Sequence, residues 1–238
     1  MITTITLNAS IDKAYHMERA IENGTVMRVG AVRNTAGGKG MNVARIIRLC
    51  GENVLASGLA GGGYNGRYLE KLLDQDGICH DFDHIKGETR SCINILDEQF
   101  GSTEYLEPGC QVTEEEENHF LKRFPEIIKD SDVVAISGSV PCGVSRDIYQ
   151  KTVRMAKEAK KQVILDTSGD LLERGIQACP DIVKPNKDEM EMLFQIKIES
   201  REDVIASGEK LRKQGIPWVV VSLGGEGALM FCEEGIFL

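Results

Sequence analysis

Val54-Leu-Ala-Ser-Gly-Leu-Ala60, continued by Gly61-Gly-Gly-Tyr-Asn-Gly66 and Arg67-Tyr-Leu-Glu-Lys-Leu-Leu-Asp-Gln-Asp76, is the stretch that decides the fold class. The first run is apolar nearly throughout, as expected for a strand that is covered on both faces. The last run places Leu69, Leu72 and Leu73 on one side of a helix, and Gly77 follows as its end signal. A buried strand that leads through glycines into an amphipathic helix is the repeating unit of a parallel α/β sheet.

The same alternation of strand and helix patterns recurs on both sides of this stretch. The other predicted strands are Ile2–Asn8, Val133–Ser137, Val163–Asp166, Ile182–Lys184 and Trp218–Leu223. The other predicted helices are Met41–Cys50, one that begins after a capping box of Thr113 with Glu116, one that begins at Ser145, and one from Ser200 to Gly215. The pattern predicts a mostly parallel sheet between two layers of helices.

Two segments, Asp12–Val32 and Glu88–Leu106, break this alternation. They read as strands with polar and apolar residues in alternation and with no helix nearby. We therefore expect one domain over residues 1–238 that carries a small β-sheet lid over one edge of the main sheet. An exposed edge of this lid is a surface through which a homodimer can form.

Composition and charge exclude several classes of protein. The formal net charge of -9 argues against a nucleic-acid partner, and no run of about 18 apolar residues is present that would span a membrane. The chain begins directly with a strand pattern, so no signal peptide is predicted. Its 7 cysteines form no Cys-x-x-Cys motif. They are typical of reduced thiols in a cytoplasmic protein.

Polar and glycine-rich clusters follow the predicted strands. Ligands of such sheets bind outside the carboxyl ends of the strands, so these clusters together predict a binding site. The clusters are Asn8–Asp12, Thr35–Asn42, Gly61–Gly66, Ser137–Pro141, Asp166–Gly169, Lys184–Glu189 and Ser222–Gly227.

Ala36-Gly-Gly-Lys-Gly-Met-Asn42 is the most informative cluster, because it places glycines at the start of a helix. It is not a P-loop, since Arg33 stands where that motif needs glycine. Together with Thr6-Leu-Asn-Ala-Ser-Ile-Asp12, it closely resembles the sugar-binding signatures of the ribokinase-like, phosphofructokinase-B family of carbohydrate kinases. The resemblance is greatest to the branch of tagatose-6-phosphate kinases and 1-phosphofructokinases. It implies that Asp12 binds sugar hydroxyls, with Gly38, Lys39 and Asn42 beside it.

The resemblance extends to residues for the phosphate of the substrate. Thr89-Arg90 resembles the family step that holds this phosphate, and the guanidinium fork of arginine suits phosphate oxygens. Arg28 is a second candidate cation on the other lid segment. Ser139, in Ser137-Gly-Ser-Val-Pro141, resembles an element on the sugar side.

Two further motifs resemble the nucleotide side of these kinases. They are Lys184-Pro-Asn-Lys-Asp-Glu189 and Val220-Val-Ser-Leu-Gly-Gly-Glu-Gly227. The residues that they imply for ATP and Mg²⁺ are Lys184, Asn186, Glu189, Ser222, Gly224 and Gly227. Glu189 is expected to act on Mg²⁺ through water. Asn186 with Glu189 also fits the pattern of a capping box, and the two roles can coexist.

The general base of the family is the Asp of a Gly-x-Gly-Asp step, which we expect beyond Leu238, so no catalytic residue is assigned within the sequence. The resemblance implies an ATP-dependent kinase that phosphorylates a ketohexose monophosphate, either tagatose 6-phosphate or fructose 1-phosphate, and that lacks its C-terminal part here. A non-catalytic fragment that binds sugar phosphate is the alternative.

Gly61-Gly-Gly-Tyr-Asn-Gly66 supports a third hypothesis. It matches the Gly-x-Gly-x-x-Gly pattern of dinucleotide-binding proteins, with Asp81 and Asp83 downstream, and taken alone suggests an NAD-dependent oxidoreductase. However, it follows the second predicted strand, whereas the dinucleotide motif belongs after the first. The position of the motif therefore argues against this hypothesis.

Overall fold

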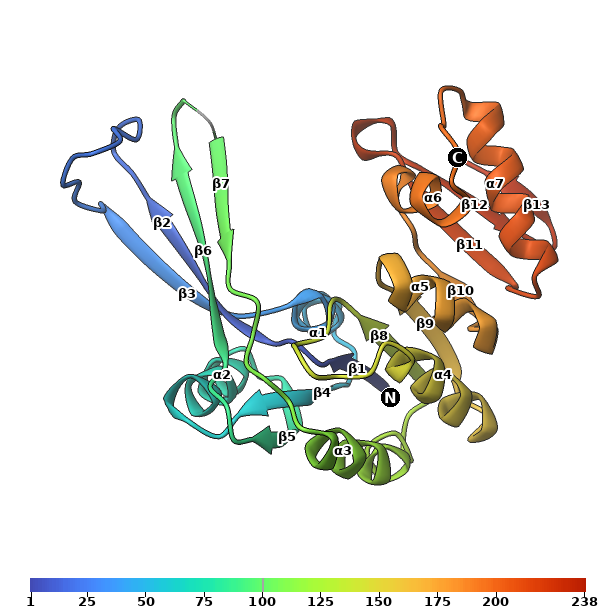
Figure 1. The fold of residues 1–238 in the computed structure, drawn as a ribbon, viewed down its shortest axis with the longest axis horizontal. Coiled ribbons are helices and arrows are strands. Elements are labelled where there is room, and N and C mark those ends of the chain that lie inside the picture. Colours follow the sequence, from blue (N-terminus) through green and yellow to red (C-terminus); the bar gives the residue numbers. More distant parts are fainter. Residues whose placement is uncertain (100) are drawn as a thin grey trace.

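The computed structural model describes residues 1–99 and 101–238, so Phe100, inside the second predicted lid segment, lies outside the described residues. In the described part the chain forms one large sheet with helices on both faces and a smaller, separate sheet (Figure 1). The predicted fold class, a three-layer α/β/α architecture with a β-sheet lid, is confirmed.

The large sheet has the strand order β13-β12-β11-β10-β9-β8-β1-β4-β5. Adjacent strands of this sheet pair in parallel from β11 to β5. Strands β12 and β13 pair antiparallel and form the edge opposite β5. The strands are β1 (Ile2–Thr6), β4 (Val54–Gly61), β5 (Cys79–Ile85), β8 (Val133–Ser137), β9 (Gln162–Asp166), β10 (Ile182–Val183), β11 (Trp218–Ser222), β12 (Ala228–Cys232) and β13 (Gly235–Phe237).

The helices divide between the two faces of this sheet. On β4, Ala56 and Ala60 pack in a core with α1 and α2, while Leu59 packs in a second core with α3 to α7. Alternate residues of a strand point to opposite faces, so one strand serves both cores. The helices are α1 (Lys39–Leu49), α2 (Tyr64–Gln75), α3 (Glu114–Ile127), α4 (Ile148–Glu158), α5 (Gly169–Gly175), α6 (Lys187–Phe194) and α7 (Arg201–Lys213), with 3₁₀ turns η1 (Ile176–Ala178) and η2 (Gly224–Glu226).

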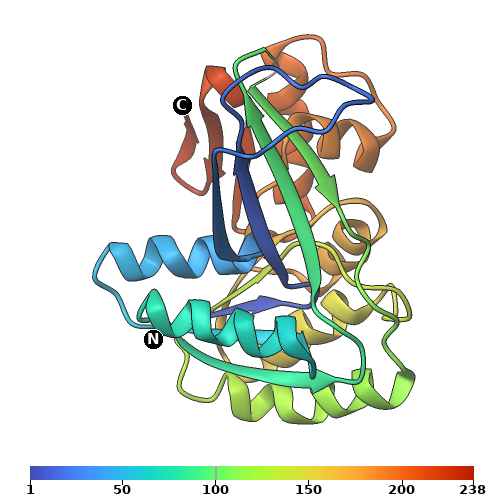
Figure 2. The ribbon, with the colours of Figure 1, turned by 90° about the vertical axis from the view of Figure 1, so that its left-hand side faces the viewer.

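The lid is a four-stranded sheet that stands on the main body beside α1 and α2 (Figure 2). Its strands lie in the order β3-β2-β6-β7 and are β2 (Ser10–His16), β3 (Ala31–Gly37), β6 (Arg90–Asp97) and β7 (Gly101–Leu106). We expected the first lid segment to end at Val32, but β3 pairs with β2 up to Gly37. The lid therefore runs straight into the glycine turn before α1.

Several predicted boundaries need correction. We expected a helix to begin at Ser145, but α4 begins at Ile148, because Ser145 instead gives its backbone N–H and its hydroxyl to the carboxylate of Glu117. Strands β5, β12 and β13 were not predicted. The capping box of Thr113 with Glu116 is present as predicted. Among the described residues, none of the helices has the length and apolar composition to cross a membrane.

Candidate functional site

A cavity of about 650 Å³ lies between the lid and the start of α1. Its lid side consists of cross-strand neighbours, because Asp12 pairs with Thr35 on β3 and with Cys92 on β6, and Cys92 pairs with Leu106 on β7. Residues from all four lid strands thus share one face. The lining residues are Ser10, Asp12, Lys13, Ala14, Arg33, Thr35, Gly38, Lys39, Asn42, Arg45, Arg90, Cys92, Ile93, Asn94, Glu104 and Leu106.

Asp12 lies at the base of this cavity. The hydroxyl of Ser10 donates to Asp12 Oδ1 at 2.6 Å, which orients the carboxylate. A Cβ atom at Gly37 would lie 2.0 Å from Asp12 Oδ1, so the carboxylate occupies the space that the missing side chain leaves. Its remaining lone pairs can accept hydrogen bonds from ligand hydroxyls.

The first turn of α1 lines the same cavity as Asp12. Gly38 is the N-cap with φ 105°, a backbone conformation that favours glycine, and no side chain among the described residues caps this helix. Met41 and Asn42 donate their N–H groups to the carbonyl of Gly38, which leaves the N–H groups of Lys39 and Gly40 in this turn for a polar or anionic ligand. Lys39 and Asn42 follow in that turn and line the cavity.

Arg90 closes the cavity at the base of the lid. Its Nε and Nη2 donate to the carbonyl of Asn8 at 3.2 and 3.1 Å, and its Nη1 donates to the carbonyl of Glu107 at 2.7 Å. Both acceptors are neutral, so the positive charge of Arg90 is held in place without being neutralised by these contacts. This is a suitable arrangement for binding phosphate.

A smaller cavity of about 210 Å³ adjoins the first, because Gly38, Lys39 and Arg90 line both. Its far wall contains Ser139, whose hydroxyl accepts from the side-chain amide of Asn8 at 3.2 Å. The hydroxyls of Thr167 and Tyr149 donate to the carbonyl of Gly138 at 2.8 and 3.2 Å and so hold the turn before Ser139. The residues that line the smaller cavity are Thr6, Asn8, Gly38, Lys39, Arg90, Gly138, Ser139, Thr167 and Ser168.

Asp166 connects this region with the predicted nucleotide residues. It lies at the end of β9, and Lys39 Nζ approaches one of its oxygens at 2.9 Å while Lys184 Nζ approaches the other at 3.3 Å. The side chain of Asp166 is only 13% exposed. The two lysines, one from each predicted subsite, therefore share one carboxylate.

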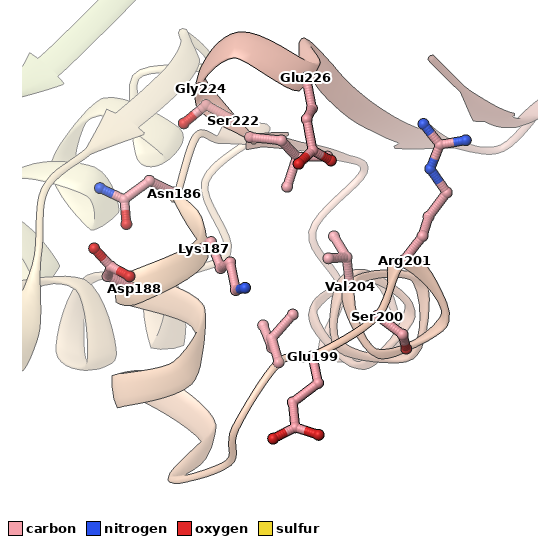
Figure 3. Close-up of a pocket in the computed structure, with 12 residues that line it drawn as sticks. Asn186, Lys187, Asp188, Glu199, Ser200, Arg201, Val204, Ser222, Gly224 and Glu226 are labelled. Carbon is pink, nitrogen blue, oxygen red and sulfur yellow. The ribbon is translucent and has the colours of Figure 1, made fainter.

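A third cavity of about 450 Å³ lies where the loop after β11 meets the starts of α6 and α7 (Figure 3). Asn186, Ser222 and Gly224 of the predicted nucleotide residues line it, together with Lys187, Asp188, Ile198, Glu199, Ser200, Arg201, Val204, Leu223 and Glu226. Asn186 forms an isolated bridge with Ser222, which brings the two predicted motifs together. Lys184, Glu189 and Gly227 are not among the described residues that line it.

Glu189 has a structural partner of its own. Its Oε2 accepts from the backbone N–H of Asn186 at 2.9 Å, while Asn186 Oδ1 accepts from the backbone N–H of Glu189 at 2.8 Å, so the two form a capping box for α6. The described residues contain no cluster of three or more His, Cys, Asp or Glu side chains that could hold a metal. These residues fit Mg²⁺ only as an ion held mainly by nucleotide phosphates and water.

Arg28 and the Gly61–Gly66 motif do not line the three cavities described above. Arg28 is exposed in the segment 17–30 and is not among the described residues that line the large cavity. At Gly61–Gly66 the carboxylate of Glu88 accepts from the backbone N–H groups of Tyr64, Asn65 and Gly66. The N-terminus of α2, which would bind a dinucleotide pyrophosphate, is thus filled by the protein itself.

Asn8 and Arg45 hold other residues of the site, and neither was given an individual role from the sequence. Asn8 supplies both the carbonyl that holds Arg90 and the amide that holds Ser139. Arg45 lines the large cavity and donates to Asn42 Oδ1 at 2.9 Å. Its spacing of three residues from Asn42, which puts both on one side of a helix, was the available signal.

Comparison with known proteins gives a consistent family assignment. The chain is 29% identical to phosphofructokinase-2 from Escherichia coli in complex with fructose-6-phosphate, with a TM-score of 0.92 over 99% of this chain and 78% of that one. It is 30% identical to a candidate 1-phosphofructokinase from Thermotoga maritima, with a TM-score of 0.90 over 99% of this chain and 75% of that one. The model of the pfkB family carbohydrate kinases matches residues 5–237. The chain therefore belongs to the pfkB family of carbohydrate kinases, which are ATP-using phosphotransferases with an alcohol group as acceptor.

Proposed function

We propose that this protein binds a ketohexose monophosphate under its lid and phosphorylates it with ATP to the bisphosphate. The observation that carries the proposal is the large cavity, where a hydroxyl acceptor (Asp12) and a held cation (Arg90) line the same space. A sugar phosphate needs both groups, because it has hydroxyls at one end and a dianion at the other.

The other residues of the cavity have roles that complement these two. Gly38 would present backbone N–H groups, Lys39 a positive charge and Asn42 a side-chain amide to the sugar. Ser139 would contact the substrate from the adjoining smaller cavity. Arg28 remains a proposed second phosphate ligand that would need the lid tip to approach the cavity.

On the nucleotide side, Asn186, Ser222 and Gly224 support the proposal by lining one cavity. Lys184, Glu189 and Gly227 are proposed to contact the phosphates from its surroundings. Bound Mg²⁺ would supply charge neutralisation between the nucleotide phosphates, and Glu189 would orient its water ligands. We assign no general base among residues 1–238, so the proposed roles of these residues are to bind and position the substrates.

Within this class, tagatose 6-phosphate is our first candidate substrate and fructose 1-phosphate the second. The sequence around Thr89 and Arg90 favours the former by its resemblance to tagatose-6-phosphate kinases. The similar protein from Thermotoga maritima, described as a candidate 1-phosphofructokinase, supports the latter.

The proposal is tested by calorimetric titration of the chain with tagatose 6-phosphate, fructose 1-phosphate, fructose 6-phosphate and inorganic phosphate. ADP release is then followed with ATP, Mg²⁺ and each sugar phosphate. We expect binding of one sugar phosphate that is lost in D12N and in R90M but kept in R154M, which changes an exposed arginine on α4. Binding of none of these sugar phosphates would refute the proposal.

Binding of sugar phosphate without turnover is the second candidate function. The observation that favours it is that the described cavities contain groups for binding a sugar phosphate, which is all that this function requires. Saturable sugar-phosphate binding with no ADP release would support this second candidate over the first.

We also propose that the lid mediates a homodimer. β3 and β7 are its edge strands, and Val32 and Tyr105 on them are 54% and 59% exposed. Unpaired strand edges with exposed apolar side chains favour pairing with another chain. The E. coli phosphofructokinase-2 relative, which is 29% identical to this chain, is described in a tetrameric inhibited form. Sedimentation of the chain should give a dimer that the charged substitution Y105D weakens, and a monomer at all concentrations would contradict the proposal.

A further inference from the structure

Arg45 makes three hydrogen bonds to three different segments around the large cavity. Its Nη1 donates to Asn42 Oδ1 at 2.9 Å, its Nη2 to the carbonyl of Ala36 at 2.8 Å, and its Nε to Asp76 Oδ2 at 3.0 Å. Asn42 lies one turn earlier on α1, Ala36 precedes the glycine turn, and Asp76 caps the end of α2. The arginine therefore ties the end of β3 and both helices together beside the ligand space.

The bond to Asn42 determines how its amide can act. An asparagine side chain has an oxygen that only accepts and a nitrogen that only donates. Because Arg45 can only donate, it takes the oxygen of Asn42 and leaves the nitrogen for a ligand. We propose that Arg45 is a positioning residue that makes Asn42 a hydrogen-bond donor to the sugar phosphate.

This role complements the chemistry of Asp12. Asp12 is an acceptor and binds ligand hydroxyls through their hydrogens, whereas Asn42, held by Arg45, would bind a hydroxyl or phosphate oxygen. Without Arg45 the amide could turn over and present its oxygen, which would repel a phosphate oxygen. The Ala36 bond fixes the guanidinium to the backbone before Gly37, which keeps the guanidinium in place beside Asn42.

A direct role of Arg45 as a phosphate ligand is the competing explanation, because its side chain also lines the cavity. Its ion pair with Asp76 at 3.0 Å argues against that role. Asp76 compensates the charge of Arg45, while Arg90 is held by neutral carbonyls. The remaining side-chain exposure of Arg45 is 22%. The geometry therefore favours action through Asn42.

The inference rests on the proposed function. A double-mutant cycle distinguishes a failure of the inference from a failure of the proposed function. Dissociation constants for the sugar phosphate that the parent chain binds best are measured by calorimetry for N42A, R45M and N42A/R45M. R48M is the matched control, because Arg48 lies on the same helix, is exposed and is not among the described residues that line the cavity. Thermal unfolding of each variant shows whether it is folded, and R45Q replaces R45M in the cycle if R45M is not.

We expect R45M to weaken binding about tenfold, which corresponds to about 1.4 kcal/mol. In the N42A background the same substitution should change the dissociation constant by less than about twofold, since a positioning residue has nothing left to position. R48M should bind like the parent chain.

Two results would overturn the inference while leaving the sugar site intact. One is an unchanged dissociation constant in R45M, and the other is an equal loss from R45M with and without Asn42, which would assign Arg45 direct contact with the ligand. If the parent chain bound no sugar phosphate, the proposed function would fail and the inference with it.

Discussion

The carboxylate of Glu88 offers a sharp test of how this fold is held together. Glu88 lies in the loop between β5 and β6 and accepts from the backbone N–H groups of Tyr64 at 2.9 Å, Asn65 at 3.1 Å and Gly66 at 3.4 Å. It also accepts from the N–H of Thr89 at 3.0 Å. A negative charge therefore stands at the positive end of α2 and joins that helix to the base of the lid.

The magnitude of an E88A substitution follows from these contacts. A hydrogen bond to a charged group contributes about 1.5–3 kcal/mol, and a charge at a helix N-terminus about 0.3–1 kcal/mol. Glu88 is exposed, so water can replace the carboxylate at the released N–H groups and several such bonds do not add. We therefore expect the free energy of unfolding to fall by about 2 kcal/mol, and the melting temperature by about 4–8 °C for a chain of this size.

The assay is urea and thermal unfolding followed by circular dichroism. E88Q, which keeps an acceptor oxygen but not the charge, should lie between E88A and the parent chain. E52A is the control, because Glu52 is exposed in the loop between α1 and β4. E88A should also weaken sugar-phosphate binding, since Arg90 lies two residues further on. A melting temperature of E88A within about 1 °C of that of E52A would refute the reasoning.

Two further predictions concern α3. Arg123 donates to Asp81 and, at 2.6 Å, to Asp83, which is 5% exposed. R123M should lower the free energy of unfolding by about 3 kcal/mol, because it leaves a buried carboxylate poorly paired, while R154M should leave this free energy unchanged. Equal urea midpoints for R123M and R154M would contradict this prediction. Glu116 accepts from the backbone N–H of Lys86 and then of Thr113, which lowers its pKa below the ordinary 4.5. A carboxylate whose pKa is lowered in the folded state stabilises the fold above pH 4.5, and this stabilisation is lost as the pH falls through the pKa of the folded state. E116Q should therefore lose less stability than the parent chain on acidification below pH 4.5. Parallel curves of stability against pH for the two proteins would contradict this prediction.

The site residues that could be recognised in advance are those that belong to short local motifs. Asp12, Gly38, Lys39, Asn42 and Arg90 were all expected at one site, and the structure places them around one cavity. Their motifs were readable because each is a short run of residues, with Asp12 inside β2, Gly38 at the start of α1 and Arg90 at the start of β6. Arg28 was expected there too, but a lone cation in a loop carries no local information about which way the loop folds.

Local patterns by themselves determined the α/β class, the separate lid and the capping boxes at Thr113 and Asn186. These features depend on residues within a few positions of one another, where backbone geometry leaves few arrangements. The hydrophobic pattern missed β5, β12 and β13. Strand β5, with the sequence Cys79-His-Asp-Phe-Asp-His-Ile85, lies at an edge of the sheet and carries polar residues that contact neighbouring helices, His80 with Asp74 of α2 and Asp83 with Arg123 of α3.

Only the tertiary structure decided which groups became partners across long separations in the chain. Glu88 fills the glycine-rich start of α2, which rules against a dinucleotide there although the motif is formally present. Lys39 meets Asp166 across 127 residues, and Arg45 meets Asp76 on a different helix. Such contacts depend on the order of the strands in the sheet. No local pattern contains that order, because it is set by contacts between residues that are far apart in the chain.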